Sequence, residues 1–151
     1  ESVAVDETLR SAALKLLGHV KWHGVAMVEF RIAPDNKAYL MEVNTRFWGS
    51  LQLAIDSGVN FPYWVCATEL GLEPPKQKSY RHGQRLRWLL GDVDSLYLYL
   101  RSAKFTFKQK FMRCVQFLVG TPFKCKHEIN RISDLKPAVY EFKTYLKDIL
   151  H

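Results

Sequence analysis

Long apolar runs, paired cysteines and low-complexity segments are all missing from this chain of 151 residues. No apolar run approaches the roughly 20 residues that a membrane-spanning helix needs, and the first residues carry no signal-peptide pattern. There is no Pro-, Gly- or Ser-rich tract and no internal repeat. These absences argue against membrane-spanning, secreted, fibrous and repeat proteins. A content of 48% hydrophobic and 25% charged residues is typical of a globular domain.

Cysteines are few and show no pairing pattern. Cys66, Cys114 and Cys125 make an odd number, and no two of them form a C-x-x-C pair. We therefore expect no disulfide framework and a reduced, cytoplasmic location. The Cys-x-His sequence at residues 125–127 is too short a pattern to indicate a zinc site.

Acidic residues are few in the second half of the chain. Residues 1–75 carry 6 Lys or Arg and 9 Asp or Glu, whereas residues 76–151 carry 16 and 6. A basic surface attracts nucleic acid, anionic membranes or acidic substrates. In the basic stretch from residue 104 onward, however, apolar residues recur near helical spacing at Phe107, Phe111, Val115 and Leu118. We expect this apolar side to pack inward, with no nucleic-acid partner and no membrane contact.

Two apolar, β-prone segments each carry one acidic residue, which is unusual in a strand that packs into a core. Residues 24–30 contain Glu29, and residues 38–46 contain Glu42, followed by Asn44 and Arg46. Burying an ionised carboxylate in an apolar strand is costly unless a partner compensates its charge. The two acids therefore need partners, which are either a bound cation or the neighbouring arginines.

The segment between these strands predicts a hairpin. Residues 33–37 contain Pro, Asp and Asn, which favour a turn. Folding about that turn brings Glu29 roughly opposite Glu42, and side-chain alternation puts Asn44 and Arg46 on the face of Glu42. These oxygen ligands suit magnesium or manganese better than zinc. The alternative is a half-buried hairpin whose acids pair with Arg31 and Arg46.

Two acids thirteen positions apart, the second in an acid-x-Asn sequence, within strand, turn and strand resemble the metal-binding core of ATP-grasp ligases. Residues 41–46, Met-Glu-Val-Asn-Thr-Arg, are similar to the segment of biotin carboxylase and the carbamoyl-phosphate-synthase-like branch. The resemblance implies an α+β fold, in which a C-terminal ATP-grasp subdomain has an antiparallel sheet flanked by helices and a helix-rich tail follows it. It also implies ATP and two magnesium or manganese ions, held by Glu29, Glu42 and Asn44.

The resemblance extends to other residues. It implies that Arg46 faces the transferred phosphoryl group as a catalytic and substrate-binding residue, and that Met41 packs near the nucleotide. Ser50 is a candidate N-cap of a helix ended by Gly58, and a helix amino end there can bind an anion. Arg87, on an alternating strand over residues 84–90, is a further candidate substrate contact. Alternatively, Ser50 caps an ordinary helix and Arg87 is a surface charge.

The function implied by the resemblance is ATP-dependent ligation of a carboxylate to an amine through an acyl-phosphate. Two other functions stay open. One is a non-catalytic interaction module whose basic helical tail binds a partner or an anionic membrane surface. The other is a metal-dependent hydrolase, which is disfavoured because no His or Ser nucleophile pattern accompanies the acids.

The chain is shorter than ATP-grasp ligases require. We expect residues 1–75 to be the ATP-grasp C-terminal subdomain and residues 76–151 a basic strand-plus-helical extension on the same core. The expected partners are the N-terminal domains of the same enzyme, without which the piece is inactive, and the small-molecule carboxylate and amine. An unpaired edge strand makes a homodimer a further expectation.

Helical periodicity places the remaining elements. We expect one helix from Asp6, with an apolar stripe that ends near residues 22–24, and another over residues 63–70. Helical patterning resumes at Asp92, breaks near residues 120–122, and returns in a final amphipathic helix that Asp134 caps.

Overall fold

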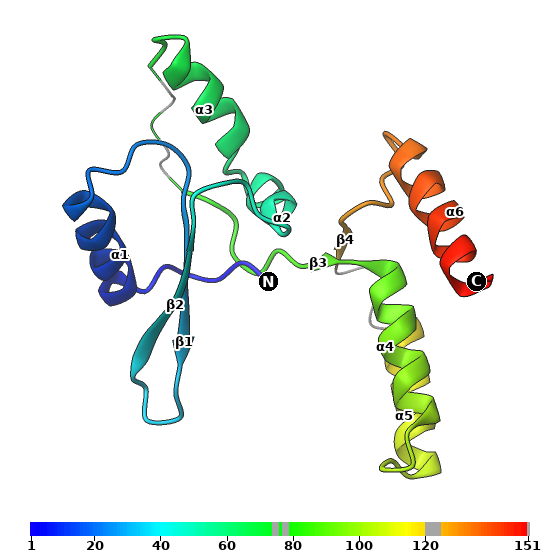
Figure 1. Ribbon diagram of the computed structural model, residues 1–151. Helices are drawn as coiled ribbons and strands as arrows, with labels where there is room; N and C mark the ends of the chain where they lie inside the picture. The colour runs from blue at the N-terminus through cyan, green and yellow to red at the C-terminus, as the bar shows by residue number, and fades with distance from the viewer. Residues whose placement is uncertain (74–75, 77–78, 120–124, 151) are drawn as a thin grey trace. The chain divides into compact units, whose positions relative to one another are not determined.

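We describe the fold from a computed structural model, which describes residues 1–73, 76, 79–119 and 125–150. The chain divides into two compact units, a first unit of Glu1–Gly83 and a second unit of Gln84–His151. Both contain helices and small sheets, so the expected α+β class is confirmed (Figure 1). The domain boundary expected at residues 75 and 76 stays a prediction.

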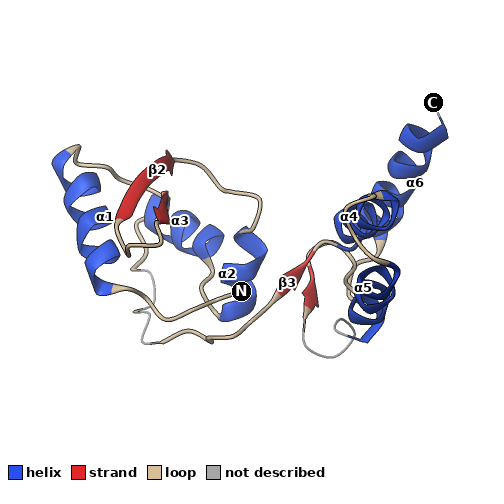
Figure 2. Ribbon diagram, turned by 90° about the horizontal axis from the view of Figure 1, so that it is seen from below, coloured by secondary structure: helices blue, strands red, loops and turns tan. Residues whose placement is uncertain are grey.

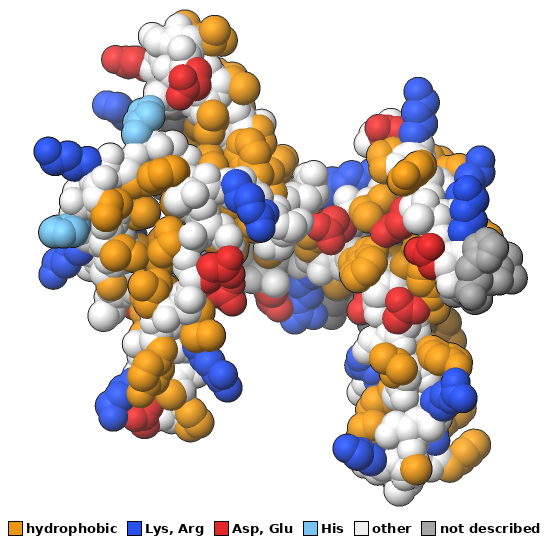
Figure 3. Space-filling model, in the orientation of Figure 1, with side chains coloured by type: hydrophobic (Ala, Val, Ile, Leu, Met, Phe, Trp, Pro, Cys, Tyr) orange, Lys and Arg blue, Asp and Glu red, His pale blue; other side chains and the backbone are white. Residues whose placement is uncertain are grey.

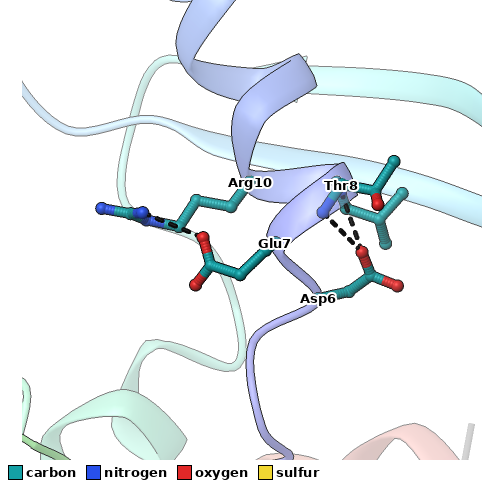
Figure 4. A network of polar contacts seen from close by, with 5 residues as sticks. Asp6, Glu7, Thr8 and Arg10 are labelled. Atoms are coloured by element: carbon teal, nitrogen blue, oxygen red, sulfur yellow. Dashed lines mark hydrogen bonds and ion pairs between the residues drawn. The ribbon is translucent and has the colours of Figure 1, made fainter.

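The first unit opens with helix α1 (Glu7–His19), which begins where the sequence predicts. Asp6 is its N-cap and accepts hydrogen bonds from the backbone N–H groups of Thr8 at 2.8 Å and Leu9 at 3.1 Å (Figure 4). One turn further on, Arg10 pairs with Glu7 at 3.0 Å. The cap satisfies two of the amide donors that a helix start leaves free.

A β-hairpin follows α1. Strand β1 (Met27–Ile32) runs antiparallel to β2 (Ala38–Asn44), and the two form a sheet of their own. In the turn between them Asn36 adopts a left-handed conformation (φ 61°), and its backbone N–H donates to the Ala33 carbonyl oxygen at 2.9 Å. Asp35 pairs with Lys37 at 2.9 Å. The hairpin predicted from the Pro-Asp-Asn segment is therefore confirmed.

Two short helices complete the first unit. Helix α2 (Leu51–Ser57) ends at Gly58, whose φ of 102° is the left-handed C-cap conformation that glycine adopts without strain. Helix α3 (Phe61–Glu69) has Asn60 as its N-cap and begins two residues before the expected start at residue 63. In both views of the ribbon, α1 and α2 lie on opposite sides of the hairpin (Figures 1 and 2).

The N-terminal segment is tied to the end of the first unit. The Ser2 hydroxyl donates to the Arg81 carbonyl oxygen at 2.8 Å, and the Gly83 N–H donates to the Ser2 carbonyl oxygen at 2.7 Å. The Tyr80 hydroxyl donates to the Val3 carbonyl oxygen at 2.7 Å. These bonds explain why residues 79–83 belong to the first unit.

The second unit is mainly helical. Strand β3 (Leu86–Arg87) pairs in parallel with β4 (Lys126–His127), and helices α4 (Leu89–Arg101), α5 (Phe107–Val119) and α6 (Lys136–Leu150) make up the rest. The predicted strand over residues 84–90 is too long, because the chain becomes helical at Leu89. Asp134, the expected cap, lies two residues before the first residue of α6 and accepts a hydrogen bond from the Lys136 N–H at 3.1 Å. The predicted break near residues 120–122 lies outside the described residues.

Side-chain pairs brace the second unit. Arg87 pairs with Asp92 on α4, and its guanidinium lies 4.6 Å from the centre of the Phe117 ring on α5. Trp88 donates from Nε1 to a Glu141 carboxylate oxygen at 2.5 Å, which links the start of α4 to α6. The Trp88 ring also lies so close to Gly91 that a Cβ there would stand 2.3 Å from it.

A second contact joins α4 to α6. The Tyr145 hydroxyl donates to the Asp94 carboxylate, and this hydrogen bond raises the pKa of Tyr145 above its ordinary value of 10.0. Asp92, Asp94 and Glu141 of this unit are therefore each bound to another side chain.

Neither unit has an extensive core. Among the described residues, Ala67 is the only buried hydrophobic side chain, whereas Asp56, Ser57 and Arg87 are buried polar ones. Many large apolar side chains stay exposed, as the space-filling view shows (Figure 3). In the described parts of the chain, no helix combines the length and apolarity needed to cross a bilayer.

Candidate functional site

The two predicted acids lie directly opposite each other. The register of the hairpin pairs Glu29 with Glu42 and Met27 with Asn44. Directly opposed residues of an antiparallel pair share a face, and residues two apart on one strand do so as well. Glu29, Glu42 and Asn44 therefore lie on one face of the hairpin, as the sequence predicts.

An irregularity at Met41 creates this arrangement. Near the turn Phe30 pairs with Leu40, and continuing that register would place Glu42 opposite Val28. The register shifts between Glu29 and Phe30, so that Met41 is left without a partner and Glu42 moves opposite Glu29. Bulges of this kind re-aim side chains and occur frequently next to active sites.

The bulge also separates the two faces of the hairpin by polarity. One face carries the two acids and Asn44, together with Met27, Arg31 and Tyr39. The other face carries only apolar residues, which are Val28, Phe30, Ile32, Ala38, Leu40 and Val43. Sequence reasoning missed the bulge, although the spacing of Leu40 and Glu42 signals it, since two residues of opposite polarity two apart do not suit a regular strand.

The acids have no protein partner within the described chain. Glu29 and Glu42 are exposed, and neither forms a hydrogen bond or ion pair with a described residue. The alternative in which Arg31 and Arg46 pair with them is not formed. Like charges directly opposite each other on a sheet repel. The pair is thus suited to receive positive charge from outside the protein chain.

Arg46 follows the end of β2 and is exposed. Its Nη1 donates to the Phe47 carbonyl oxygen at 3.2 Å, which uses one of its five N–H donors. The remaining donors are available for an oxyanion beside the hairpin. Met41 is 57% exposed at the bulge, so its side chain is free to pack against a planar group.

Ser50 occupies the N-cap position of α2, but its side chain makes no capping hydrogen bond. The helix has only seven residues, so its amino end contributes little to anion binding. Ser50 instead lines a cavity of about 250 Å³ in the first unit. The cavity is mainly apolar, with Trp48, Phe61 and Tyr80 among its walls.

Arg87 has a different environment from Arg46. Its side chain is 8% exposed, pairs with Asp92 and stacks over Phe117. These contacts account for the residue structurally. Its role as a substrate contact stays a prediction.

The residues on the polar face fit a hard divalent cation. Two opposed carboxylates and a nearby amide offer oxygen atoms, the ligands that magnesium and manganese prefer. Among the described residues, no three His, Cys, Asp or Glu side chains gather closely enough to form a metal site by themselves. Magnesium sites commonly use one or two carboxylates and leave the other positions to water and phosphate, so the pair fits a metal–nucleotide site.

Comparison with known proteins gives a family match that covers the hairpin. A family model described as "ATP-grasp in the biosynthetic pathway with Ter operon" matches residues 1–91, which contain the whole hairpin. No curated protein and no solved structure matches the chain. The closer likeness to biotin carboxylase and the carbamoyl-phosphate-synthase-like branch is not shown by these comparisons. Because the match covers more than half of the sequence, this chain belongs to that ATP-grasp family, whose members are typically ATP-dependent ligases.

Proposed function

We propose that the β1–β2 hairpin is the metal- and phosphate-binding element of an enzyme that joins a carboxylate to an amine with ATP. One observation supports this most strongly. Glu29 and Glu42 face each other on the polar side of the hairpin, without a protein partner in the described chain, inside the segment that matches the ATP-grasp family.

In this proposal Glu29, Glu42 and Asn44 hold two magnesium or manganese ions. Bound there, the ions would supply the positive charge that phosphoryl transfer requires. The two carboxylates provide strong anionic ligands, and the Asn44 amide adds a neutral oxygen. Their mutual repulsion is relieved when a cation is present, which favours occupancy by metal–nucleotide.

Arg46 has the second role. A guanidinium binds an oxyanion through two parallel N–H donors, which orients the group as well as attracting it. We assign Arg46 to the transferred phosphoryl group. The substrate carboxylate attacks the γ-phosphate of ATP, ADP leaves, and an acyl-phosphate results. The amine then attacks the acyl carbon, phosphate leaves, and the amine loses a proton.

The remaining assignments follow from position. Met41, exposed at the bulge, contacts the nucleotide, and the cavity lined by Ser50 receives an apolar part of the substrate. For Arg87 to contact the substrate, its guanidinium would first have to separate from the Asp92 carboxylate. We further propose that activity needs additional domains that cover the hairpin, such as the N-terminal domains expected from the family. The scarcity of buried apolar side chains supports that requirement.

Manganese titration of the 151-residue chain tests the metal site directly. Mn²⁺ with ATP should broaden the NMR signals of residues near Glu29 and Glu42 before any others. The double variant Glu29→Gln, Glu42→Gln should lose this broadening, because it keeps the shape of the side chains but removes both charges. Glu69→Gln, an exposed acid on α3, is the matched control and should behave as the unchanged chain does.

Unchanged broadening in the double variant would remove the metal site and the ligase proposal with it. Activity provides a separate test in an enzyme that contains this chain. ADP formation that requires both a carboxylate and an amine supports ligation. ADP formation with neither present supports the hydrolase alternative instead.

A further inference from the structure

Helix α5 presents an apolar stripe that no described residue covers. We define the α5 stripe as Phe107, Phe111 and Leu118, which lie on one face of the helix because they are four and eleven residues apart. Their exposed fractions are 86%, 61% and 69%. The inward packing expected from the sequence is therefore wrong for these three residues, which face solvent. Val115, the fourth residue of the predicted apolar side, is partly buried.

A different side of α5 contacts α4. The Arg113 guanidinium lies 6.0 Å from the centre of the Tyr99 ring on α4, and the Phe117 ring contacts the Arg87 guanidinium on β3. Tyr99 also stacks on Phe105 in the loop before α5, with ring centres 3.7 Å apart. The α4–α5 hairpin is thus held together by residues outside the α5 stripe, so the stripe is not needed for that contact.

The sequence segment that contains α5 carries only positive charge. Between Asp94 and Glu128 the sequence has no acid, and it has seven basic residues there: Arg101, Lys104, Lys108, Lys110, Arg113, Lys124 and Lys126. Lys104 and Lys108 are exposed beside the amino end of the stripe. Hydrophobic and basic side chains lie next to each other over this hairpin in the space-filling view (Figure 3).

We propose that α5 is a membrane-surface helix that lies on anionic lipid, with the α5 stripe turned into the boundary between head groups and acyl chains. An amphipathic helix with aromatic residues on one face and lysines on the other binds such interfaces. Lysine stems run along the apolar boundary while the ammonium groups reach the phosphates. The exposed phenylalanines, together with the acid-free basic segment that contains α5, match both requirements.

Other occupants match the surface less well. Nucleic acid uses the basic residues, but the aliphatic Leu118 at the far end of the stripe gains nothing from a phosphate backbone. The inference concerns the second unit and stands apart from the proposed ligase site, so either can fail without the other.

Vesicle sedimentation with the 151-residue chain tests the proposal. Vesicles of phosphatidylcholine with about one-third phosphatidylserine should bind the chain, vesicles of phosphatidylcholine alone should bind it at least about tenfold more weakly, and added salt should weaken the binding. Equal binding to both vesicle types, or no binding to the anionic ones, overturns the proposal.

Two pairs of variants locate the surface. Phe107→Ser with Phe111→Ser should reduce binding by on the order of tenfold or more, whereas Leu14→Ser, an equally exposed apolar residue on α1, should leave it unchanged. Lys104→Gln with Lys108→Gln should cost about fivefold for each charge. Lys143→Gln with Lys147→Gln on α6 is the matched control and should cost less.

Circular dichroism shows whether each variant keeps its helices, and the lysine pair remains informative if the phenylalanine pair does not fold. Competition with DNA is a further test. The proposal is overturned if duplex or single-stranded DNA displaces vesicles from the unchanged chain and the two phenylalanine substitutions leave DNA binding unaffected. Full vesicle binding by both α5 variants also overturns it, since it places the lipid contact elsewhere.

Discussion

Polar side chains are used differently in the two units of this protein. On the hairpin of the first unit, Glu29 and Glu42 face each other without a protein partner in the described chain. In the second unit the carboxylates of Asp92, Asp94 and Glu141 each accept a hydrogen bond from a side chain elsewhere in the unit. Paired acids are explained by the fold, whereas the opposed and unpaired acids of the hairpin are the ones for which we propose a ligand. This difference separates candidate site residues from structural ones.

The two units also differ in charge. Glu1–Gly83 carries nine Lys or Arg and nine Asp or Glu, and Gln84–His151 carries thirteen and six. The whole net charge of +7 therefore belongs to the second unit. A neutral unit with two opposed acids suits a metal and nucleotide, and a basic unit with an exposed apolar stripe suits an anionic surface.

Shifting the register of the hairpin should have the largest effect. Inserting one alanine after Met41 moves Glu42 opposite Val28 if the ladder keeps its single bulge, because a one-residue slip changes the face of a side chain. The affinity of the chain for Mn²⁺ should then fall by on the order of a hundredfold. Paramagnetic broadening of the Glu29 signals measures this affinity.

Deleting Met41 is the matched control. The ladder then runs regularly from Phe30 and Leu40 to Glu29 and Glu42, so the acids stay opposite each other. Mn²⁺ affinity should change by no more than about threefold. A deletion that abolishes binding while the insertion does not would contradict the assigned role of the bulge.

Removing the buried guanidinium of the second unit comes next in size. Arg87→Met deletes the pair with Asp92 and the contact with Phe117, and should lower the free energy of unfolding by about 2 kcal/mol. The value is below that of a fully buried pair because the Asp92 side chain is 43% exposed. Urea unfolding followed by circular dichroism measures it.

Lys143→Met, at an exposed position on α6, should leave the free energy of unfolding nearly unchanged. If Arg87→Met keeps full stability but weakens substrate binding in the enzyme, Arg87 is a substrate contact. Arg87 would then be a candidate site residue, as the polar residues of the hairpin are.

A smaller effect is expected at the hairpin turn. Asn36 has a φ of 61°, a conformation that alanine adopts at a cost of roughly 1 kcal/mol and glycine without cost. Asn36→Ala should therefore lower the population of the folded hairpin, and Asn36→Gly should maintain it. Cross-strand NMR contacts between Glu29 and Glu42 report that population. Equal behaviour of the two variants would show that the turn does not determine the register.

The smallest effects concern pH, and they have opposite signs in the two units. The hydrogen bond from Lys37 holds the pKa of Asp35 below its ordinary 3.8. Asp35 therefore stabilises the hairpin above that pH, and its contribution is lost as pH falls through the lowered pKa. Tyr145, whose pKa Asp94 raises, stabilises the second unit below pH 10.0 and ceases to do so as pH rises through the raised pKa.

Asp35→Asn should remove the acid-dependent part of hairpin stability, and Asp94→Asn should return the pKa of Tyr145 toward its ordinary value. An ultraviolet absorbance titration of tyrosine and a pH series of hairpin NMR signals measure the two effects. A loss of hairpin stability at high pH, rather than low, would contradict the Asp35 assignment.

Local sequence signals predicted much of the first unit. Asp6 starts α1, Gly58 ends α2, and the Pro-Asp-Asn turn joins two antiparallel strands, because each of these depends on neighbouring residues alone. The opposed acids were also predicted from spacing about the turn. The bulge at Met41 was not, since it depends on which strand face each side chain joins.

Sequence reasoning was less successful in the second unit. The alternation around Arg87 suggested a strand through residue 90, but Leu89 already begins α4, where the following residues have helical periodicity. Strand β4 is only two residues long and pairs with β3 across some forty residues, which no local pattern reveals. The orientation of the α5 stripe was misjudged for a related reason, because amphipathicity shows that a face exists but not what covers it.

Trp88 is the only tryptophan in the second unit, and it lies against Gly91 while its indole nitrogen bonds to Glu141 on α6. The indole therefore acts as a built-in optical reporter for the attachment of the last helix. After the other three tryptophans are replaced by phenylalanine, Trp88 can be excited selectively. Separation of α6 from α4 would then change the wavelength of its fluorescence emission. Position 91, meanwhile, must stay without a side chain for that reporter to keep its place.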